Sequence, residues 1–474
     1  MTMFTLRDAA ALIPGASFIG DENVDIDRIV TDSRVIQTGD LFVAIKGDRF
    51  DAHDFIDQVA KSGAAAALVS RDPSNADAWA LPVIKVKDTR IGLGALAHGW
   101  RKRFTMPLVA VTGSNGKTTV KEMIASIFAA AVGEESRLAT AGNFNNDIGL
   151  PLTLFRLNHA HKLAVVELGM NHPGETEALG KIAAPTVSVV NNAQREHQEF
   201  MATVEAVALE HASVIHALGE TGTAVFPADD AYASIWRVAA TGNPIMDFAL
   251  TDDASKAAVT GTLKGTTVHM RTPQGEIDIA LSVLGEHNAR NALAAASAAL
   301  AAGVSLDAIK RGLEAFQPVK GRLQVKRAIV GALNGATVID DTYNSNPDSM
   351  RAAIDVLASQ AAPRVLVMGD MGEVGDQGPA FHREVGAYAA ERGIDALFAL
   401  GDASRDSVAA FNAAGKPGAT HFTDVAALTA ALEHTGFGNT ATYLAKGSRF
   451  MKMERVVDAL TSPQSATGNQ PAAH

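Results

Sequence analysis

Short apolar runs alternate with longer stretches in which apolar residues recur every three or four positions along most of the chain. Short apolar runs bounded by turn residues are typical of strands in a parallel sheet, and the longer periodic stretches are typical of amphipathic helices. From Leu108 onward this alternation is regular, through the runs "LVAVTG", "LAVVELG", "TVSVVN" and "TAVF". The pattern predicts an α/β protein made of strand–helix–strand units.

Changes in the pattern divide the chain into three α/β domains and a tail. Residues 1–107 mix helical patterns with the short strands "DRIVTDSR", "DLFVAIKG", "AAAALVS" and "LPVIKVK". Residues 108–320 form the regular parallel part, and residues 321–460 alternate again through "ATVID", "RVLVMGD", "ALFALGD" and "ATYLAKG". Residues 461–474 are small, polar and contain proline, so we expect a disordered tail. Three such domains without long linkers favour a ligand held between domains.

Two segments of the central part have patterns of their own. Residues 266–285 read as two alternating strands around Thr-Pro-Gln-Gly, which predicts a β-hairpin. The helical stretch "HNARNALAAASAALAAG" follows and ends at Gly303. After Val120 the apolar positions predict one buried helix face, formed by Met123, Ile124, Ile127, Phe128 and Ala131.

Composition narrows the classes of function. The 474 residues include 52 acidic and 41 basic ones, giving a formal charge of −11. This charge disfavours non-specific binding to nucleic acid or anionic membranes, but it leaves phosphorylated small molecules open. The absence of cysteine excludes disulfides, thiolate metal sites and a cysteine nucleophile. With no signal-peptide pattern and no apolar window of membrane-spanning length, we expect a soluble cytoplasmic protein.

A turn between a predicted strand and a predicted helix is the strongest chemical signal. Glycines let backbone N–H groups approach phosphate oxygens, and a helix N-terminus adds positive partial charge. Lys117 would reach the β- and γ-phosphates, and the Thr118 hydroxyl would hold Mg²⁺. Val111 stands where the usual phosphate-loop pattern has glycine, so a tight turn with an exposed lysine is the alternative. The predicted ATP-binding loop comprises Gly113, Ser114, Asn115, Gly116, Lys117, Thr118 and Thr119.

Further motifs extend this signal over nearly the whole chain. In order they are "TDSR", "GDLFVAIKGDRFDAHDF", "VAVTGSNGKTT", "TAGNFNNDIGLPLT", "GEHNARNALAA", "KGRLQV", "DDTYNSNPDSM" and "LAKGSRFMKMERVV". This series resembles the Mur ligase family, which joins amino acids to a carboxylate. The resemblance implies a small N-terminal UDP-binding α/β domain. It further implies a central P-loop domain with a parallel sheet plus a β-hairpin region, and a C-terminal Rossmann-like domain.

Within the family, "YNSNP" and "KGSR" are most similar to the branch that joins D-alanyl-D-alanine to UDP-N-acetylmuramoyl-tripeptide. The resemblance implies an ATP-dependent, ADP-forming amide-bond ligase of cytoplasmic peptidoglycan synthesis, acting through an acyl phosphate. The expected partners are these two substrates, with ATP and Mg²⁺ as cofactors, no nucleic acid, no membrane, and a monomeric state. Three alternatives remain: the sister ligase that adds the third amino acid, a P-loop small-molecule kinase, and a non-catalytic nucleotide switch. The D-N-P-R motif usual in the sister ligase is absent.

The resemblance also implies metal ligands. Glu167 ends a predicted strand, where a carboxylate can hold Mg²⁺ together with Thr118, and His197 would lie near a second Mg²⁺; a solvated glutamate and a structural histidine are the alternatives. Many family members carry a CO₂-carbamylated lysine on the following helix, but this chain has no lysine between Lys181 and Lys256. We hypothesise that Glu210 supplies that carboxylate, with an exposed glutamate on an amphipathic helix as the alternative.

The remaining roles follow from matching positions in the motifs. Lys117, His197 and Arg322 are the expected catalytic residues, with Arg322 reaching the γ-phosphate when the domains close. Asn291, near His287 and Asn288, would contact adenine, and Asp341 would contact the ribose. The UDP-sugar candidates are Asp32, Ser33, Arg34, Gly47, Arg49, Asp51, His53, Asn143, Asn145 and Asn146. The acceptor candidates are Tyr343, Asn344, Asn346, Lys446, Ser448 and Arg449. Ordinary turn residues and a solvent-exposed charged loop are the alternatives.

Overall fold

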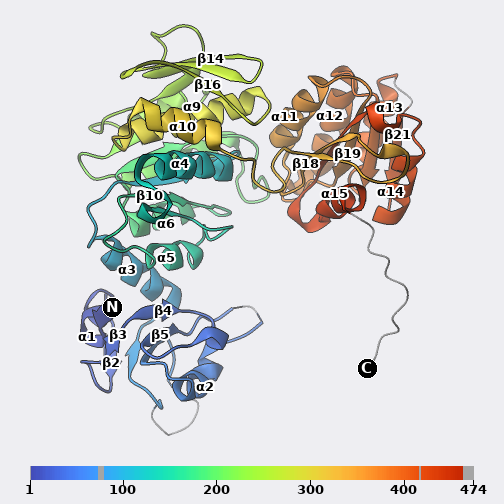
Figure 1. The fold of residues 1–474 in the computed structure, drawn as a ribbon. Helices are drawn as coiled ribbons and strands as arrows, with labels where there is room; N and C mark the ends of the chain where they lie inside the picture. The colour runs from blue at the N-terminus through green and yellow to red at the C-terminus, as the bar shows by residue number, and fades with distance from the viewer. Residues whose placement is uncertain (1, 48, 73–78, 416–417, 463–474) are drawn as a thin grey trace, which may run out of the picture.

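The computed structural model describes residues 2–47, 49–72, 79–415 and 418–462. The predicted tail lies outside the described residues from residue 463 onward. Figure 1 shows an N-terminal part at the bottom, a central part above it, and a C-terminal part to one side. The expected boundaries at 107 and 320 fall in the connections before β8 and before β17. None of the described helices is long and apolar enough to cross a membrane.

The N-terminal part contains one main sheet. Its spatial order is β2 (Ser17–Ile19), β7 (Val83–Lys85), β6 (Ala66–Val69), β5 (Asp40–Val43) and β4 (Arg28–Val30). All neighbours are parallel except β2, and the four strands predicted from the sequence are confirmed. A small antiparallel pair joins β1 (Phe4–Thr5) to β3 (Asp25–Ile26). The helices are α1 (Leu6–Ala11), α2 (Ile56–Lys61) and α3 (Thr89–Arg101), with 3₁₀ turns η1 (Ser33–Val35) and η2 (Ala52–Phe55).

A five-stranded parallel sheet forms the middle of the molecule. Its spatial order is β12 (Thr223–Val225), β11 (Val187–Val190), β8 (Leu108–Thr112), β10 (Leu163–Glu167) and β9 (Arg137–Ala139). Side chains of β8 alternate between two hydrophobic cores, with Val109 in one and Leu108 in the other. A strand buried on both faces needs a continuous apolar run, which explains "LVAV". The helices are α4 (Lys117–Val132), α5 (Gly149–Leu154), α6 (Glu175–Ala183), α7 (Val204–His216) and α8 (Ala233–Ala239), with η3 (Glu134–Ser136).

A second sheet completes the central part. The predicted hairpin is confirmed as β15 (Thr267–Thr272) and β16 (Gly275–Ala280), but β13 (Phe248–Leu250) and β14 (Val259–Lys264) extend it to four strands. The predicted helix is α9 (Glu286–Ala301), and α10 (Leu306–Ala315) follows. The α4 face packs as predicted, except that Ala131 is exposed. Figure 1 shows α9, α10 and α4 layered between the two sheets.

The C-terminal part is a six-stranded sheet. Its spatial order is β17 (Gln324–Arg327), β18 (Thr337–Asp341), β22 (Thr442–Lys446), β19 (Arg364–Gly369), β20 (Ala396–Leu400) and β21 (Ala419–Phe422). Only β17 is antiparallel, and the four predicted strands are confirmed. The helices are α11 (Pro347–Ala358), α12 (Gly378–Glu391), α13 (Arg405–Ala413), α14 (Val425–Glu433) and α15 (Glu454–Thr461). The 3₁₀ turns are η4 (Gly331–Leu333), η5 (Gly375–Gln377), η6 (Gly438–Thr440) and η7 (Arg449–Met451).

Candidate active site

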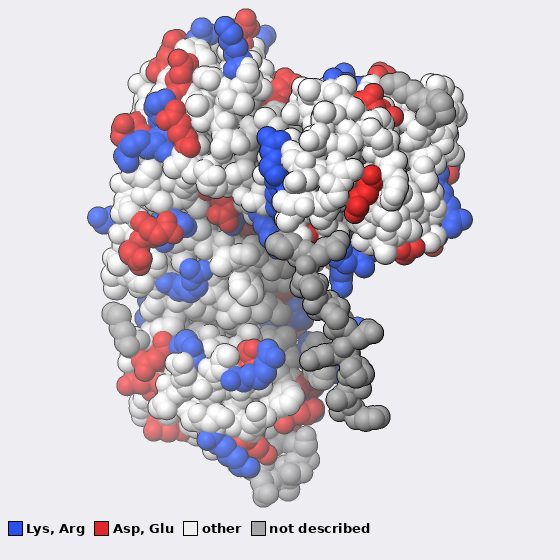
Figure 2. All heavy atoms as spheres, turned by 45° about the vertical axis from the view of Figure 1, so that its right-hand side comes forward, with Lys and Arg blue, Asp and Glu red and all other residues white. Residues whose placement is uncertain are grey.

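A cleft of 830 Å³ lies between the central and C-terminal parts. Its walls are the turn before α4, the segments after β10 and β11, the start of α9, and the loop after β18. Parallel sheets place ligand sites at the carboxyl ends of their strands, and two sheets present those ends here. Figure 2 shows small mixed groups of charged side chains over the face in view, with basic side chains along the groove where the two parts meet.

The turn before α4 is held in shape by asparagines that follow β11. The N–H of Ser114 donates to the carbonyl of Asn192 at 3.1 Å, and the N–H of Asn115 donates to the Asn192 side chain at 2.9 Å. Gly116 caps α4 with φ of 81°, a left-handed conformation that favours glycine. A Cβ there would lie 2.5 Å from Oδ1 of Asn291, so the position admits no larger side chain without movement. The turn is therefore fixed, and the backbone N–H groups at the start of α4 have the arrangement expected of an anion-binding loop.

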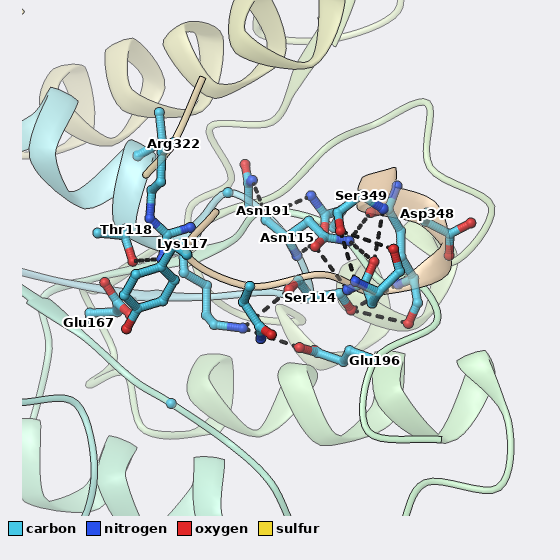
Figure 3. A pocket seen from close by; sticks show the side chains of 18 of the residues that line it. Ser114, Asn115, Lys117, Thr118, Glu167, Asn191, Glu196, Arg322, Asp348 and Ser349 are labelled. Carbon is cyan, nitrogen blue, oxygen red and sulfur yellow. Dashed lines mark hydrogen bonds and ion pairs between the residues drawn. The ribbon is translucent and has the colours of Figure 1, made fainter. Parts of the chain in front are cut away.

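A buried network of hydrogen bonds and ion pairs connects this loop to α7. The ammonium of Lys117 donates to the carbonyl of Gly113 at 2.5 Å and to Oε2 of Glu196 at 3.2 Å (Figure 3). Oε1 of Glu196 lies 2.8 Å from Nε2 of His211, and Nδ1 of that ring lies 3.0 Å from the Thr112 hydroxyl. Burial alone would raise the pKa of Glu196, but Lys117 and His211 outweigh it and lower the pKa to about 2. The carboxylate is therefore ionised at neutral pH.

Glu167 offers an unpartnered carboxylate oxygen to the cleft. Its Oε1 accepts a hydrogen bond from Nδ2 of Asn145 at 2.8 Å, while its buried Oε2 has no hydrogen-bond partner. An orphaned buried oxygen of a residue that lines the same cleft as Thr118 suits a hard cation such as Mg²⁺. No group of three or more His, Asp or Glu side chains that could hold a metal occurs among the described residues. Mg²⁺ would therefore complete its shell with phosphate oxygens and water, as it commonly does.

His197 occupies a strained position on the floor of the cleft. Its φ is 47°, and Leu323 and Glu373, which also line the cleft, have φ of 52° and 58°. Left-handed backbone at residues other than glycine is costly and gathers at functional sites. Nδ1 of His197 lies 2.7 Å from Oε2 of Glu373, although the two atoms are not aligned as a hydrogen bond. His197 thus faces the C-terminal part across the cleft.

Arg322 reaches from the connection before β17 to the phosphate loop. Its Nη2 donates to the Thr118 hydroxyl at 2.8 Å, and its guanidinium lies 4.3 Å from the centroid of the Tyr343 ring. Figure 3 shows Arg322 directly above Thr118 and Glu167. Arg322 therefore contacts the predicted phosphate loop, and the aromatic ring fixes the guanidinium plane. Its contact with a γ-phosphate stays a prediction.

A second bridge between the two parts was not predicted from the sequence. The guanidinium of Arg195 binds Asp348 at 2.6 Å and Glu384 at 2.7 Å. The hydrogen bonds of these carboxylates raise the pKa of Arg195 above its ordinary value, and the larger effect comes from Glu384. Nδ2 of Asn346 also donates to Oδ1 of Asn115 at 2.9 Å. Bidentate, half-buried guanidinium–carboxylate pairs are geometrically specific, so these contacts fix how the two walls meet.

The residues expected around the nucleoside line both sides of the cleft, with Asn291 on α9 of the central part and Asp341 at the end of β18 in the C-terminal part. Asn291 accepts from Asn191 at 2.9 Å and donates to Asn288 at 3.0 Å, so both ends of its amide are already used within the protein. Burial lowers the pKa of the nearby His287. Asp341 pairs with the ammonium of Lys446 at 2.7 Å and accepts from the N–H of Leu323. All of these side chains except Asn191 were expected to act, or to lie near a residue that acts, in nucleotide or acceptor binding.

The acceptor candidates separate into two groups. Tyr343, Asn344, Asn346 and Lys446 line the cleft, whereas Ser448 and Arg449 are not among the residues that line it. The hydroxyl of Ser448 donates to the carbonyl of Ser345 at 2.9 Å and accepts from Gly372 at 2.8 Å. Arg449 pairs with Glu454 at 2.9 Å. These two residues are held within the C-terminal part itself.

The UDP-sugar candidates are also divided. Asn143, Asn145 and Asn146 line the cleft, while those of residues 1–107 do not: Asp32, Ser33, Arg34, Gly47, Arg49, Asp51 and His53. Asp32 caps η1 and pairs with Arg34, which lowers its pKa to about 2. Asp51 caps η2 and lies 2.5 Å from Nδ1 of the buried His53, whose Nε2 accepts from the N–H of Ser70. Asn145 orients Glu167, a role that the sequence did not indicate.

The structure does not place Glu210 at the site. The residue is buried rather than exposed, and its carboxylate accepts from the backbone N–H of Gly174 at 2.9 Å and of Thr176 at 2.8 Å. It caps the positive N-terminus of α6, which satisfies a carboxylate well. The buried carboxylate beside Lys117 is instead Glu196. The sequence signal that could have found it is its place beside His197 at the end of a strand.

Comparisons with known proteins show which family the chain resembles. Models of the Mur ligase family match the catalytic domain over residues 25–101, the middle domain over residues 111–299 and the glutamate ligase domain over residues 321–449. The chain is 41% identical to UDP-N-acetylmuramoyl-tripeptide–D-alanyl-D-alanine ligase of Haemophilus influenzae, covering 95% of this chain and 97% of that protein. It is 40% identical to the enzyme of that name from Escherichia coli, over 92% and 94%.

Solved structures give the same result. The crystal structure of MurF from Acinetobacter baumannii matches with a TM-score of 0.87 at 35% identity, covering 96% of this chain and 98% of that one. MurF ligase from Thermotoga maritima, solved in complex with ADP, matches with a TM-score of 0.78 at 25% identity, covering 91% and 96%. With matching family models in all three parts, and with relatives of this identity over nearly its full length, the chain belongs to the Mur ligase family.

Proposed function

We propose that this protein is an ATP-dependent, ADP-forming ligase that joins D-alanyl-D-alanine to UDP-N-acetylmuramoyl-tripeptide in the cytoplasm. The observation that carries the proposal is the phosphate loop at one wall of a cleft whose other wall brings Arg322 onto Thr118. The full-length similarity to ligases of this name supports the choice of substrates.

The first half-reaction activates the acid. A carboxylate does not condense with an amine at neutral pH, because oxide is a very poor leaving group. A terminal carboxylate oxygen of the tripeptide therefore attacks the γ-phosphorus of ATP. The bond to the β-phosphate oxygen breaks, and an acyl phosphate and ADP form. Because phosphoryl transfer needs positioning and charge neutralisation more than covalent help, the loop amides, Lys117 and Arg322 suffice as protein groups.

The second half-reaction forms the amide. The amino group of D-alanyl-D-alanine, in its neutral form, attacks the acyl carbon, phosphate leaves with the electron pair of the C–O bond, and the nitrogen loses a proton. The cleft wall formed by Tyr343, Asn344 and Lys446 is where we place the dipeptide. Asn143 and Asn146, on the side of the N-terminal part, are placed toward the UDP-sugar.

Mg²⁺ fits this site. Glu167 and Thr118 would hold it, with His197 toward a second ion, and the metal would screen the negative charge of the phosphates. Because Asn145 occupies the other oxygen of Glu167, the free Oε2 is already directed at the cleft. Asn145 therefore acts by orienting a ligand rather than by touching the nucleotide.

The proposal is tested by phosphate release from ATP with UDP-N-acetylmuramoyl-tripeptide, with and without D-alanyl-D-alanine. We expect release to require the dipeptide and to disappear in the Lys117→Ala variant. Release that ignores the dipeptide would favour a kinase, and release with diaminopimelate or lysine in its place would favour the sister ligase. Nucleotide binding without any release would favour a switch.

A further inference from the structure

Glu196 and His211 have no role in the function proposed above, yet they are among the most buried ionisable side chains beside the cleft. Glu196 is 5% exposed and His211 is fully buried. Burying a carboxylate is costly unless it is paired and hydrogen-bonded, and Glu196 is both. A pair of this kind in direct contact with the phosphate-loop lysine calls for a functional explanation.

The contacts form one chain with a defined direction. An ionised carboxylate can only accept, so Nε2 of His211 carries the proton of the bond to Glu196. If the ring carries only this proton, its Nδ1 accepts from the hydroxyl of Thr112, which lies 3.0 Å away. Thr112 is the last residue of β8 and directly precedes the phosphate loop. His211 is therefore held in one orientation by the strand that leads into the loop.

The other oxygen of the carboxylate faces Lys117. The ammonium has three donors, and these meet the carbonyls of Gly113 and Ser114 and Oε2 of Glu196. The two carbonyls belong to the same turn and bend the lysine back over it. Only Glu196 lies on a different segment, so it alone sets the direction in which the ammonium extends across the cleft.

We propose that Glu196 is the positioning residue of Lys117, and that His211 and Thr112 hold its carboxylate in place. The proposal rests on the proposed function in one respect, that Lys117 contacts the nucleotide phosphates. Glu196 is a fixed negative charge that opposes phosphate binding while aligning the lysine for phosphoryl transfer. Its removal therefore lowers turnover without weakening nucleotide binding.

The test compares Glu196→Gln with Glu205→Gln, an exposed glutamate on α7 that removes the same charge away from the cleft. ADP affinity is measured by calorimetry in EDTA, kcat and KM for ATP by phosphate release, and the unfolding midpoint by calorimetric scanning. For Glu196→Gln we expect ADP to bind as tightly as to the wild type or up to about tenfold more tightly. We expect its kcat to fall between about tenfold and a hundredfold. Glu205→Gln should match the wild type in all three measurements.

Two results would overturn the proposal. One is a kcat for Glu196→Gln within twofold of the wild type. The other is weaker ADP binding with a lower unfolding midpoint, which a purely structural role predicts. If the wild type shows no dipeptide-dependent release, the proposed function fails. The ADP affinities then decide on Glu196 alone, because unchanged or tighter binding supports its role and weaker binding refutes it.

The link to α7 is tested separately. His211→Gln keeps a donor toward Glu196 and should retain kcat within about threefold, whereas His211→Leu removes it and should behave like Glu196→Gln. If the leucine variant does not fold, Thr112→Val tests the same link, because valine keeps the shape and removes the hydroxyl. A wild-type kcat in Thr112→Val, and also in His211→Leu if that variant folds, would refute the positioning chain.

Discussion

Replacement of Gly116 by alanine tests how closely the phosphate loop is packed. The residue has φ of 81° and ψ of −4°, and an added Cβ would lie 2.5 Å from Oδ1 of Asn291 and 2.6 Å from Nδ2 of Asn191. Such distances are shorter than any ordinary contact, so the amides must move. Nδ2 of Asn191 is the group that donates both to Asn291 and to the carbonyl of Asn115.

The magnitude follows from two contributions. Left-handed backbone costs alanine about 1–2 kcal/mol relative to glycine. Losing the two hydrogen bonds of Asn191 adds about 2 kcal/mol at roughly 1 kcal/mol each. We therefore expect Gly116→Ala to lower the free energy of unfolding of this part by about 3–4 kcal/mol. The two lost hydrogen bonds of Asn191 hold the phosphate loop in shape. If their roughly 2 kcal/mol is also lost from the transition state, kcat/KM should fall by roughly 30-fold.

Gly174 provides a matched control. It also precedes a helix, α6, with φ of 89° and ψ of −11°, and an added Cβ would meet nothing within 4 Å. Gly174→Ala should therefore lose only the backbone contribution, about 1–2 kcal/mol, and keep its activity. Phosphate release and urea unfolding of both variants measure the difference. Values of kcat/KM within threefold of each other would refute the conclusion that the Cβ contact disturbs the loop.

Three further predictions concern charged groups. Glu210→Gln should lower the free energy of unfolding by about 1 kcal/mol, because it weakens the cap of α6. The Mg²⁺ concentration needed for activity should not change, and a higher requirement would contradict the placement of Glu210 away from the site. Phosphate release should be the same in bicarbonate-free and bicarbonate-supplemented buffer, because the buried carboxylate beside Lys117 is a glutamate; strong CO₂ dependence would contradict this. Arg195 lowers the pKa of Glu384 below its ordinary 4.5, so their pair stabilises the contact between the two parts above pH 4.5 and loses this effect as the pH falls below it. Thermal midpoints of the wild type and Glu384→Gln should therefore differ at pH 7 and approach each other as the pH falls below 4.5, and a gap independent of pH would contradict the assignment.

The sequence predicted best what local pattern determines. Strands such as β8 and β10 are buried on both faces and read as continuous apolar runs, so they were identified with the carboxyl end at Glu167. The turn at Gly116 was identified because glycine, lysine and threonine occur together before a helical pattern. The edge strands β9 and β21 were missed, since short, partly exposed strands carry too few apolar residues to stand out. The edge strand β13 is apolar and mostly buried, but at three residues it is too short to form a recognisable run.

The candidate site was predicted less completely, because its decisive contacts join distant segments. Glu196 and Glu210 are both glutamates near expected ligands, and only the fold shows that one meets Lys117 while the other caps α6. Ser448 lies in a motif typical of an acceptor site, yet its hydroxyl is used within the C-terminal part. A side chain's partners depend on tertiary packing, which periodicity and spacing do not encode.

The bridge made by Arg195 makes the working cycle sensitive to ionic strength. Any motion that separates the two walls to release products has to break the half-buried pairs of Arg195 with Asp348 and Glu384. Dissolved salt screens charges over about 10 Å at 0.1 M, so it weakens the closed state more than the open one. Low salt should slow product escape and high salt should hinder assembly of the complete site, which leaves an optimum salt concentration between the two.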